Sequence, residues 1–480
     1  MGPSARSDTA RGAYRHRGDA DFYDAAVVKV GVPKEHAEGE RRVALVPDTV
    51  SKLEKSGFEE VLVESGAGFD YNLDEAYEEA GARVVDGPDE LYREADVILK
   101  IRKPDDEEIG KLREGQVLVG FLEPLTDPET AKKLADAGVS AFALELIPRI
   151  ARAQSMDALS SMGSIGGYKA ALIAADSLGR YLPMMTTAAG TTKAAKAMIL
   201  GVGVAGLQAI ATMRRLGAAV EAFDIRPEVA DQVRSLGATW IEAKDEEEDQ
   251  ETEEEEPAEP STGQKLAGGL RALLGLPERS SDENGASAPE EEGDEEAAGD
   301  EEDEEDTGGY AKEQSEEKQR RDQELVSERI TQMDVVLTTA LVPGRKAPTL
   351  VTEEMVSSMK PGSLIVDLAA ESGGNCELTE AGEIVDHEQV KIHGPTDVAS
   401  TLPIHASALL SRNMVNLLTH LVKEKDKDED DDSDDDDEPE LELDFEDQIT
   451  DETCVAHDGE VRGRTREALD QKSDKETEAQ

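Results

Sequence analysis

The chain has few cysteines, few aromatic residues and no long apolar run. Its 480 residues include two cysteines, Cys376 and Cys454, one tryptophan and 3% aromatic residues. Two cysteines cannot build a disulfide framework, and no cluster of cysteine and histidine has the spacing of a zinc site. No apolar stretch is long enough to cross a bilayer, and the polar residues 1–20 lack the apolar core of a signal peptide. We therefore expect a soluble protein of a reducing compartment, without a direct membrane span.

Basic residues are scarce relative to acidic ones. Lysine and arginine number 51 against 109 aspartate and glutamate, a formal net charge of -58 at pH 7. Such a surface repels polyanions, so nucleic acid and anionic membranes are excluded as default partners. Acidic residues occur in long runs, which indicates acidic tails on an ordinary globule, and also in helical stretches such as 74–80. The second distribution favours a salt-rich cytoplasm that screens self-repulsion, so we predict a halophilic protein.

The stretch 197–226 has the pattern of a strand, a glycine turn, a helix and a second strand. Gly201, Gly203 and Gly206 have the spacing G-x-G-x-x-G. In such a turn the glycines allow a tight bend, the approach of a pyrophosphate and close packing of helix on strand. Free N–H groups at the helix start then face the phosphates. A bend between a buried strand and a helix also uses glycines, so the triplet alone is a weak signal.

The end of the second strand strengthens the interpretation. Asp224 follows an apolar run roughly 20 residues after the turn, where a carboxylate accepts hydrogen bonds from an adenosine ribose. Arg226 leaves an alternative open, because an arginine there attracts a 2′-phosphate, whereas an unobstructed Asp224 repels one. We therefore expect NAD(H) as the cofactor of this segment.

Short apolar strands alternate with amphipathic helices from Val27 onward, as in VVKVGVP, VLVES and DVILKI. This alternation is typical of a parallel sheet covered by helices on both faces. The expected fold class is α/β, with two Rossmann-like doubly wound parallel-sheet domains joined by long helices. The expected divisions are a flexible lead at 1–25, an N-terminal α/β domain at 26–160 that residues 400–423 complete, an NAD-binding Rossmann domain at 161–400, a disordered acidic insert within it at 244–307, and an acidic tail at 424–480 that is mostly mobile.

The insert is dense in glutamate and aspartate and poor in apolar residues, so it cannot bury enough surface to offset its ordering entropy. Its one apolar string, LAGGLRALLGL at 266–276, is either a transient helix that binds a partner or part of a solvated linker. We favour the linker.

Three strings carry a resemblance to a known family. They are PRIARAQSMDALSSM at 148–162, GVGVAGLQAIAT at 201–212 and GGYAKE at 308–313. They resemble the NAD(H)-binding alpha component of the proton-translocating, Si/Re-specific NAD(P) transhydrogenases, in the alanine dehydrogenase/transhydrogenase family. The likeness extends over about 27–422 apart from the insert, and 441–461 resembles the family's tail.

The resemblance implies an assembly and a reaction. Two such chains pair as a homodimer, a membrane-embedded transhydrogenase subunit supplies the proton path, and a beta component that binds NADP(H) docks against this one. Hydride then passes directly between NAD(H) and NADP(H). The implied location is cytoplasmic, peripheral on the cytoplasmic face of the membrane complex.

The resemblance also implies which residues contact the nucleotides. Those around the nicotinamide end are Arg149, Gln154, Asp157 and Ser160. Gln154 is directed toward the second nucleotide, and Tyr310 belongs to a mobile loop that closes over the bound one. The other implied contacts are Val204, Ala205, Ile225, Gly309 and Leu341. Hydride transfer between two nicotinamides releases no substrate proton, so these residues position the rings and exclude water.

Without the resemblance, the same residues have plainer explanations. A loop with arginine, glutamine, aspartate and serine before a helix is often a solvated turn, in which Ser160 is a candidate N-cap. Arg149 has phosphate or Asp157 as alternative partners, and Tyr310 alone indicates a surface tyrosine. The sequence also departs from the family pattern at Asp322, where a glutamine is expected.

Two other functions stay open. An alanine-dehydrogenase-like enzyme needs a catalytic histidine and a lysine in the first domain, yet no histidine occurs between His36 and His387. Arg42 resembles the substrate-binding arginine of that relative, but we favour a structural role for it. The remaining alternative is a non-catalytic NAD(H)-binding module whose acidic segments recruit partners.

Overall fold

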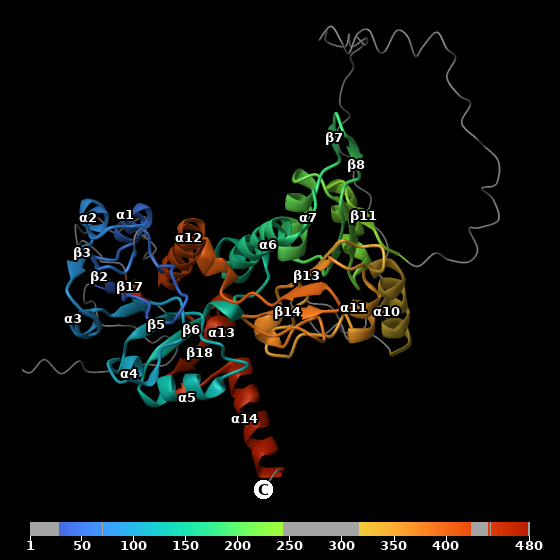
Figure 1. The fold of residues 1–480 in the computed structure, drawn as a ribbon. Helices are drawn as coiled ribbons and strands as arrows, with labels where there is room; N and C mark the ends of the chain where they lie inside the picture. Colours follow the sequence, from blue (N-terminus) through green and yellow to red (C-terminus); the bar gives the residue numbers. More distant parts are fainter. Residues whose placement is uncertain (1–27, 70, 243–315, 424–439, 442, 479–480) are drawn as a thin grey trace, which may run out of the picture. The chain divides into compact units, whose positions relative to one another are not determined.

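The computed structural model describes residues 28–69, 71–242, 316–423, 440–441 and 443–478 (Figure 1). The expected lead at 1–25, the acidic insert at 244–307 and the acidic run at 424–439 lie outside these residues. Within the described residues, no helix combines the length and the apolar composition needed to cross a membrane.

The first sheet is built mainly from the N-terminal third of the chain. Its eight strands follow the order β19-β18-β6-β5-β4-β1-β2-β3, and β1 to β6 run parallel. The strand order reverses at β1, as in a doubly wound sheet. The parallel strands are β1 (Lys29–Val32), β2 (Glu60–Glu64), β3 (Arg83–Val85), β4 (Val97–Leu99), β5 (Val117–Gly120) and β6 (Ser140–Ala143).

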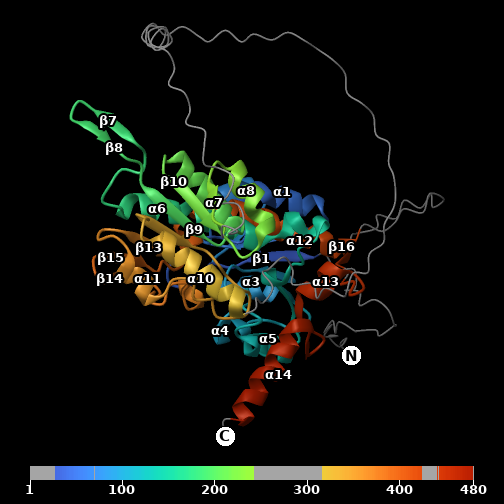
Figure 2. The same ribbon diagram turned by 90° about the vertical axis from the view of Figure 1, so that its right-hand side faces the viewer.

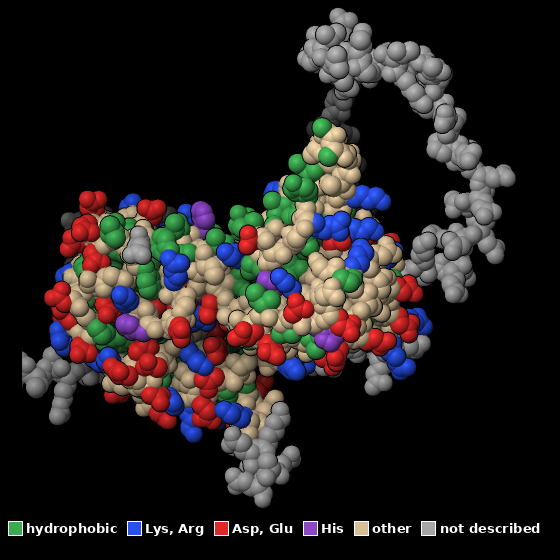
Figure 3. Space-filling model, in the orientation of Figure 1, with side chains coloured by type: hydrophobic (Ala, Val, Ile, Leu, Met, Phe, Trp, Pro, Cys, Tyr) green, Lys and Arg blue, Asp and Glu red, His purple; other side chains and the backbone are tan. Residues whose placement is uncertain are grey.

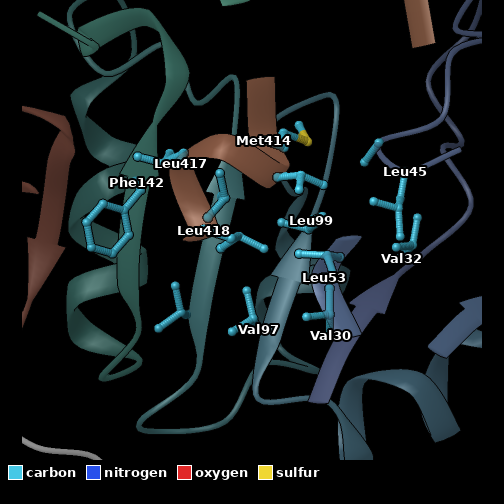
Figure 4. Packing of buried hydrophobic residues seen from close by; sticks show 14 of the residues in the cluster. Val30, Val32, Leu45, Leu53, Val97, Leu99, Phe142, Met414, Leu417 and Leu418 are labelled. Atoms are coloured by element: carbon cyan, nitrogen blue, oxygen red, sulfur yellow. The ribbon is translucent and has the colours of Figure 1, made fainter. Parts of the chain in front are cut away.

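Helices cover both faces of this sheet, because alternate side chains of each buried strand point to opposite faces. Val97 and Leu99 of β4 belong to one apolar cluster, and Ile98 between them belongs to the other. The first cluster includes Met414 and Leu418 of the long helix α12, which point toward these strands in Figure 4. The covering helices are α1 (Pro47–Lys55), α2 (Asp74–Glu79), α3 (Pro88–Glu94), α4 (Asp106–Ile109), α5 (Pro128–Asp136) and α12 (Pro403–Leu421).

The second sheet follows the order β11-β10-β9-β12-β13-β15-β14 and is parallel except for β14. Ala197 and Ile199 of β9 pack with α7 and α8, whereas Met198 and Leu200 pack with α10 and α11 on the other face (Figure 2). The strands are β9 (Lys196–Leu200), β10 (Ala219–Phe223), β11 (Thr239–Trp240), β12 (Val335–Thr338), β13 (Leu364–Asp367), β14 (Ile384–His387) and β15 (Val390–His393). The helices are α7 (Val204–Arg215), α8 (Ala230–Ser235), α10 (Glu316–Ile330) and α11 (Glu353–Ser358). Two doubly wound sheets confirm the expected fold class.

A 20-residue helix, α6 (Ala158–Ser177), confirms the long helix expected after the polar loop. It packs against α7 and α12. Two short hairpins were not expected from the sequence: β7 (Met185–Thr187) with β8 (Gly190–Thr192), which is exposed along its length, and β16 (Val422–Lys423) with β17 (Glu440–Leu441).

The expectation of a mobile C-terminal tail is wrong for its last part. Residues 448–478 form α13 (Gln448–Thr453), β18 (Cys454–His457), β19 (Glu460–Val461) and α14 (Gly463–Glu478). Strand β18 pairs antiparallel with β6 and extends the first sheet, and Ile449 and Val455 are fully buried. The apolar residues here are few, but an existing sheet edge supplies their burial and their backbone partners. A local reading of composition does not detect this.

Candidate functional site

The glycine turn connects β9 to α7 at the centre of the second sheet. Gly201 has φ +91°, and a Cβ on it would lie 2.9 Å from Thr339 Oγ1. A Cβ on Gly206 would lie 2.0 Å from the carbonyl oxygen of Gly201. Only glycine fits at these two positions, the first because of its backbone conformation and the second because helix and strand approach closely.

Gly203 differs, because a Cβ on it would meet nothing within 4 Å. It is the N-cap residue of the 12-residue helix α7, and no side chain caps this helix. The first N–H groups of α7, at Val204 and Ala205, therefore face open space at the positive end of the helix. An exposed turn with uncapped N–H groups fits the pyrophosphate of a dinucleotide.

The turn lies where the strand order of the second sheet reverses. Strand β9 has β10 on one side and β12 on the other, and ligands of such sheets bind outside the carboxyl ends at this point. Thr339, just after β12, donates from Oγ1 to the carbonyl oxygen of Gly201 (3.0 Å). Leu341 follows two residues later and is 46% exposed. The structure thus brings Leu341 to the glycine turn.

Asp224 follows β10 and also reaches the turn, but it is not unobstructed as the sequence interpretation assumed. Its Oδ2 accepts a hydrogen bond from Val202 N (2.6 Å), and its Oδ1 accepts from Arg226 N (3.0 Å). The Arg226 guanidinium bonds both oxygens, through Nε to Oδ1 (3.0 Å) and Nη2 to Oδ2 (3.2 Å). Hydrogen bonding to Asp224 raises the pKa of Arg226. Ile225, between them, is partly buried against the neighbouring apolar cluster.

Two polar residues that sequence reasoning missed support the loop of Leu341. Asn375 accepts from Ala340 N (3.0 Å) and donates to Ala340 O (2.9 Å), and it is itself held by Asp367, which accepts from Asn375 N (2.7 Å). Both side chains are fully buried. The only available sequence signal was an aspartate at the end of the apolar run LIVD.

The start of α6 lies against the glycine turn. A Cβ on Gly167 would lie 2.0 Å from the carbonyl oxygen of Ala205, and one on Gly163 would lie 3.8 Å from Ala205 N. Asp157 is the N-cap of α6 and accepts from Ser160 N (2.8 Å) and Ser160 Oγ (2.5 Å). The cap that the sequence suggested therefore exists, with Asp157 as the acceptor and Ser160 as the donor.

Arg149 and Gln154 are exposed on the segment that leads into α6. Gln154 lies in the 3-10 helix η2 (Ala151–Met156), whose residue Ser155 accepts through its carbonyl oxygen from the amides of Asn413 and Asn416 of α12, both at 2.9 Å. Gln154 therefore projects from a turn with a fixed backbone.

The segment 443–461 also contributes to this anchor. Arg152 of η2 forms an ion pair with Asp447, which in turn accepts from His420 of α12. Burial raises the pKa of Asp447, but the hydrogen bonds from Arg152 and His420 outweigh it and lower that pKa well below its usual range. Gly309 and Tyr310 lie outside the described residues.

Arg42 is committed within the protein. Its Nε and Nη2 bond the two carboxylate oxygens of Glu40 at 2.7 and 2.6 Å, and Nη1 contacts the sulfur of Met162 at 3.4 Å. Burial raises the pKa of Glu40, but the bonds and charge of Arg42 outweigh it and lower that pKa to about 2. Arg102 bonds the same carboxylate (2.8 Å). This arrangement agrees with a structural role for Arg42.

Glu145 connects the loop after β5 to the segment that leads into η2. Its carboxylate accepts from the backbone N–H groups of Leu122 (3.2 Å) and Glu123 (2.7 Å). Burial raises the pKa of Glu145 to about 7, although these N–H groups favour its ionised form. Among the described residues no group of three or more His, Cys, Asp or Glu side chains is placed to hold a metal ion.

Comparison with known proteins gives consistent matches over nearly all of the chain. Two family models match, "Alanine dehydrogenase/PNT, N-terminal domain" over 31–166 and "Alanine dehydrogenase/PNT, C-terminal domain" over 170–462. The NAD(P) transhydrogenase subunit alpha of Haemophilus influenzae is 40% identical over 433 residues, which cover 90% of this chain and 71% of that protein. The Rhodospirillum rubrum enzyme has a divided alpha subunit, whose first polypeptide is 39% identical over 441 residues, 90% of this chain and 97% of that protein.

A solved structure agrees with these matches. The crystal structure of transhydrogenase from Sinorhizobium meliloti superposes with a TM-score of 0.69 at 39% identity, covering 90% of this chain and 99% of that chain.

Proposed function

Because this chain belongs to the alanine dehydrogenase/PNT family, we propose that it is the NAD(H)-binding subunit of a transhydrogenase and exchanges hydride with NADP(H) held on a separate component. The observation that carries the proposal is the open glycine turn at the strand-order reversal, with Gly203 uncovered and α7 uncapped. Support also comes from relatives of 39–40% identity that are named as transhydrogenase alpha subunits.

The chain's residues have distinct tasks in this reaction. The bound nucleotide supplies or accepts the hydride at its nicotinamide ring. The N–H groups at the start of α7 bind the pyrophosphate, and Asp224 orients the adenosine ribose. Gln154 is exposed on the anchored η2 turn, where its amide can donate to and accept from a nucleotide on another protein. Direct transfer between two nicotinamides needs alignment and the exclusion of water, and it needs no general acid.

The test mixes the full chain with a separately made NADP(H)-binding component in molar KCl and follows the reduction of an NAD analogue by NADPH. We expect turnover that requires both components. Tight NADH binding without exchange would leave only a nucleotide-binding module. Oxidation of NADH by pyruvate and ammonia without a partner would instead establish an alanine-dehydrogenase-like enzyme, which the commitment of Arg42 to Glu40 disfavours.

The proposal extends to coupling with a membrane subunit, on whose cytoplasmic face this chain would lie. When the chain, the NADP(H) component and the membrane subunit are reconstituted in vesicles, hydride exchange should change the internal pH. Exchange that proceeds with no pH change, in sealed vesicles, would contradict the coupling.

We further propose that the chain is a homodimer that pairs through the region of the β7–β8 hairpin. The stretch 177–220 contains no acidic residue and five basic ones, in a chain with 109 aspartates and glutamates. Tyr181 and Met184, at the base of the hairpin, are 61% and 66% exposed, and Figure 3 shows uncharged side chains over the hairpin. A surface without acidic residues lets two copies of an acidic protein approach without repulsion, and apolar exposure favours burial.

Light scattering in molar KCl tests the dimer. The wild-type chain should have the mass of two copies, and the double variant Tyr181→Glu, Met184→Glu should have the mass of one. Leu73→Glu is the control, since Leu73 is equally exposed (60%) but lies on the first sheet's α2 end. A double variant that keeps the dimer mass would exclude this surface.

A further inference from the structure

The ion pair between Asp224 and Arg226 occupies the carboxylate that the adenosine ribose requires. A carboxylate offers about four lone-pair positions, and four donors already use them: Val202 N, Arg226 N, and Nε and Nη2 of Arg226. The two backbone donors are fixed by the strand end and the turn. Of the four, only the guanidinium bonds lie on a side chain that can rotate, so a ribose can reach Asp224 only where Arg226 gives way.

Exposure agrees with this division. The Asp224 side chain is 7% exposed, whereas that of Arg226 is 25% exposed. The guanidinium therefore has solvent beside it into which it can turn, while the carboxylate stays in place. After that movement a full positive charge remains next to the ribose hydroxyls, within reach of a phosphate on the 2′ oxygen.

We propose that Arg226 is a specificity-determining residue of the nucleotide site, which competes with the ribose for Asp224 and lowers the preference for NAD(H) over NADP(H). This inference rests on the proposed function. An NADH molecule must displace the guanidinium and gains nothing from it afterwards. An NADPH molecule is repelled by Asp224 but attracted by the displaced Arg226.

The competition also depends on salt. Ion pairs near a surface weaken as ionic strength rises, since the Debye length falls to about 3 Å at 1 M. The obstruction by Arg226 is therefore largest at low salt. Loss of the guanidinium should improve NADH binding more at low salt than in molar KCl.

The test measures the dissociation constants of NADH and NADPH by fluorescence for the full chain and its Arg226→Ala variant, at 0.2 M and 2 M KCl. We expect the ratio of the NADPH constant to the NADH constant to rise at least tenfold in the variant at 0.2 M. The improvement in NADH binding should shrink at 2 M. An unchanged or lower ratio would overturn the proposal.

A second comparison guards against a variant that only disturbs the loop. In the Asp224→Asn background, NADPH should bind more tightly than to the wild-type chain, and adding Arg226→Ala should remove that gain. Arg234→Ala is the matched control, because Arg234 pairs with Asp231 on the nearby α8 at 3.1 Å and should leave the ratio unchanged. If the double variant binds NADPH as tightly as Asp224→Asn alone, Arg226 has no role in specificity. If the wild-type chain binds neither nucleotide, the proposed function itself fails.

Discussion

Asp367 is fully buried at the end of β13 and accepts hydrogen bonds from Thr338, Asn375 and Thr379, among others. Asp224, at the end of β10, accepts from the glycine turn in the same way. Both carboxylates therefore join loops at the carboxyl edge of the second sheet. They differ in access, because the groups around Asp367 are all internal, whereas Asp224 has a rotatable partner that faces solvent. Only Asp224 is available to a ligand.

Glu145→Gln should make stability less dependent on pH. The folded pKa of Glu145 is raised by burial to about 7, above the roughly 4.3 of an unfolded chain. The folded state therefore binds this proton more tightly, and the resulting stability is present below pH 4.3 and lost as the pH rises toward 7. At about 1.4 kcal/mol per pKa unit, the loss is on the order of 3 kcal/mol. Urea unfolding at pH 5, 6, 7 and 8 measures it.

The comparison is between the two slopes. The wild-type free energy of unfolding should fall relative to that of Glu145→Gln over this range, because the amide does not titrate. Parallel curves for the two proteins would mean that Glu145 is already ionised at pH 5.

Gln154→Asn should slow hydride exchange at least tenfold while changing NADH affinity less than threefold. The substitution keeps the amide but withdraws it by one methylene from a turn whose backbone is fixed by Asn413 and Asn416. Alignment of two rings is sensitive to such a change, whereas binding of the pyrophosphate is not. Single-turnover exchange and NADH titration separate the two effects. Ser155→Ala is the neighbouring control, and equal losses of rate and affinity in Gln154→Asn would show that Gln154 only binds.

The residues of the site differ in how far the sequence predicts them. The glycine triplet and Asp224 are predictable, because local spacing along one strand, turn and helix determines where they lie. The bond from Arg226 to Asp224 was not predicted, since charge alone suggested a free arginine beside a free aspartate. Asn375 could not be predicted, because Ala340, its partner, lies 35 residues away and approaches only in the folded sheet.

At the scale of elements, the contact of α6 with α7 couples the η2 segment to the glycine turn. Both helices have small residues where they meet, and Gly167 lets α6 approach the backbone of Ala205. The anchored η2 turn enters α6 directly through the cap at Asp157. A shift of α6 would therefore move both the first turn of α7 and the loop with Gln154.

Gly167→Ala should destabilise the protein by about 1–3 kcal/mol, because its Cβ would lie 2.0 Å from the Ala205 carbonyl oxygen and force the helices apart. NADH binding should weaken as well, since Ala205 belongs to the first turn of α7. Gly163→Ala is the matched control, with 3.8 Å to the nearest atom, and its gain in helix propensity should leave stability equal or higher. Thermal melts and NADH titration of both variants measure the difference. A stable Gly167→Ala variant with normal affinity would contradict the coupling.

The elements that the sequence predicts well are those with a continuous apolar pattern. The parallel strands and the helices α6 and α12 were expected within a few residues, because both faces of the strands and one face of each helix are buried. The hairpins β7–β8 and β18–β19 were not expected. Strands β7 and β8 are exposed, and β18 is stabilised by pairing with β6, more than 300 residues earlier. Burial of this kind leaves little trace in the local sequence.

At the scale of the whole molecule, charge is distributed unevenly. The chain carries a formal charge of -58, and acidic side chains are spread over much of the surface in Figure 3. Many of them are exposed and paired at most with one base, as in the pairs of Lys111 and Lys133. Such pairs contribute little to stability, whereas the repulsion among unpaired charges acts over the whole surface. The balance between folded and unfolded states should therefore depend on screening.

Removal of salt should lower the melting temperature. With the charge screened in 2 M KCl, the Debye length is below about 3 Å, and it rises to about 10 Å in 0.1 M salt. If repulsion then costs about 3 kcal/mol, the melting temperature should fall by roughly 10 °C. Calorimetry over a KCl series measures the change. Sucrose at matched osmolality is the control, since it strengthens apolar burial without screening charge and should not restore the loss. A melting temperature that stays constant as salt is withdrawn, or that sucrose restores fully, would mean that the acidic surface is not an adaptation to salt.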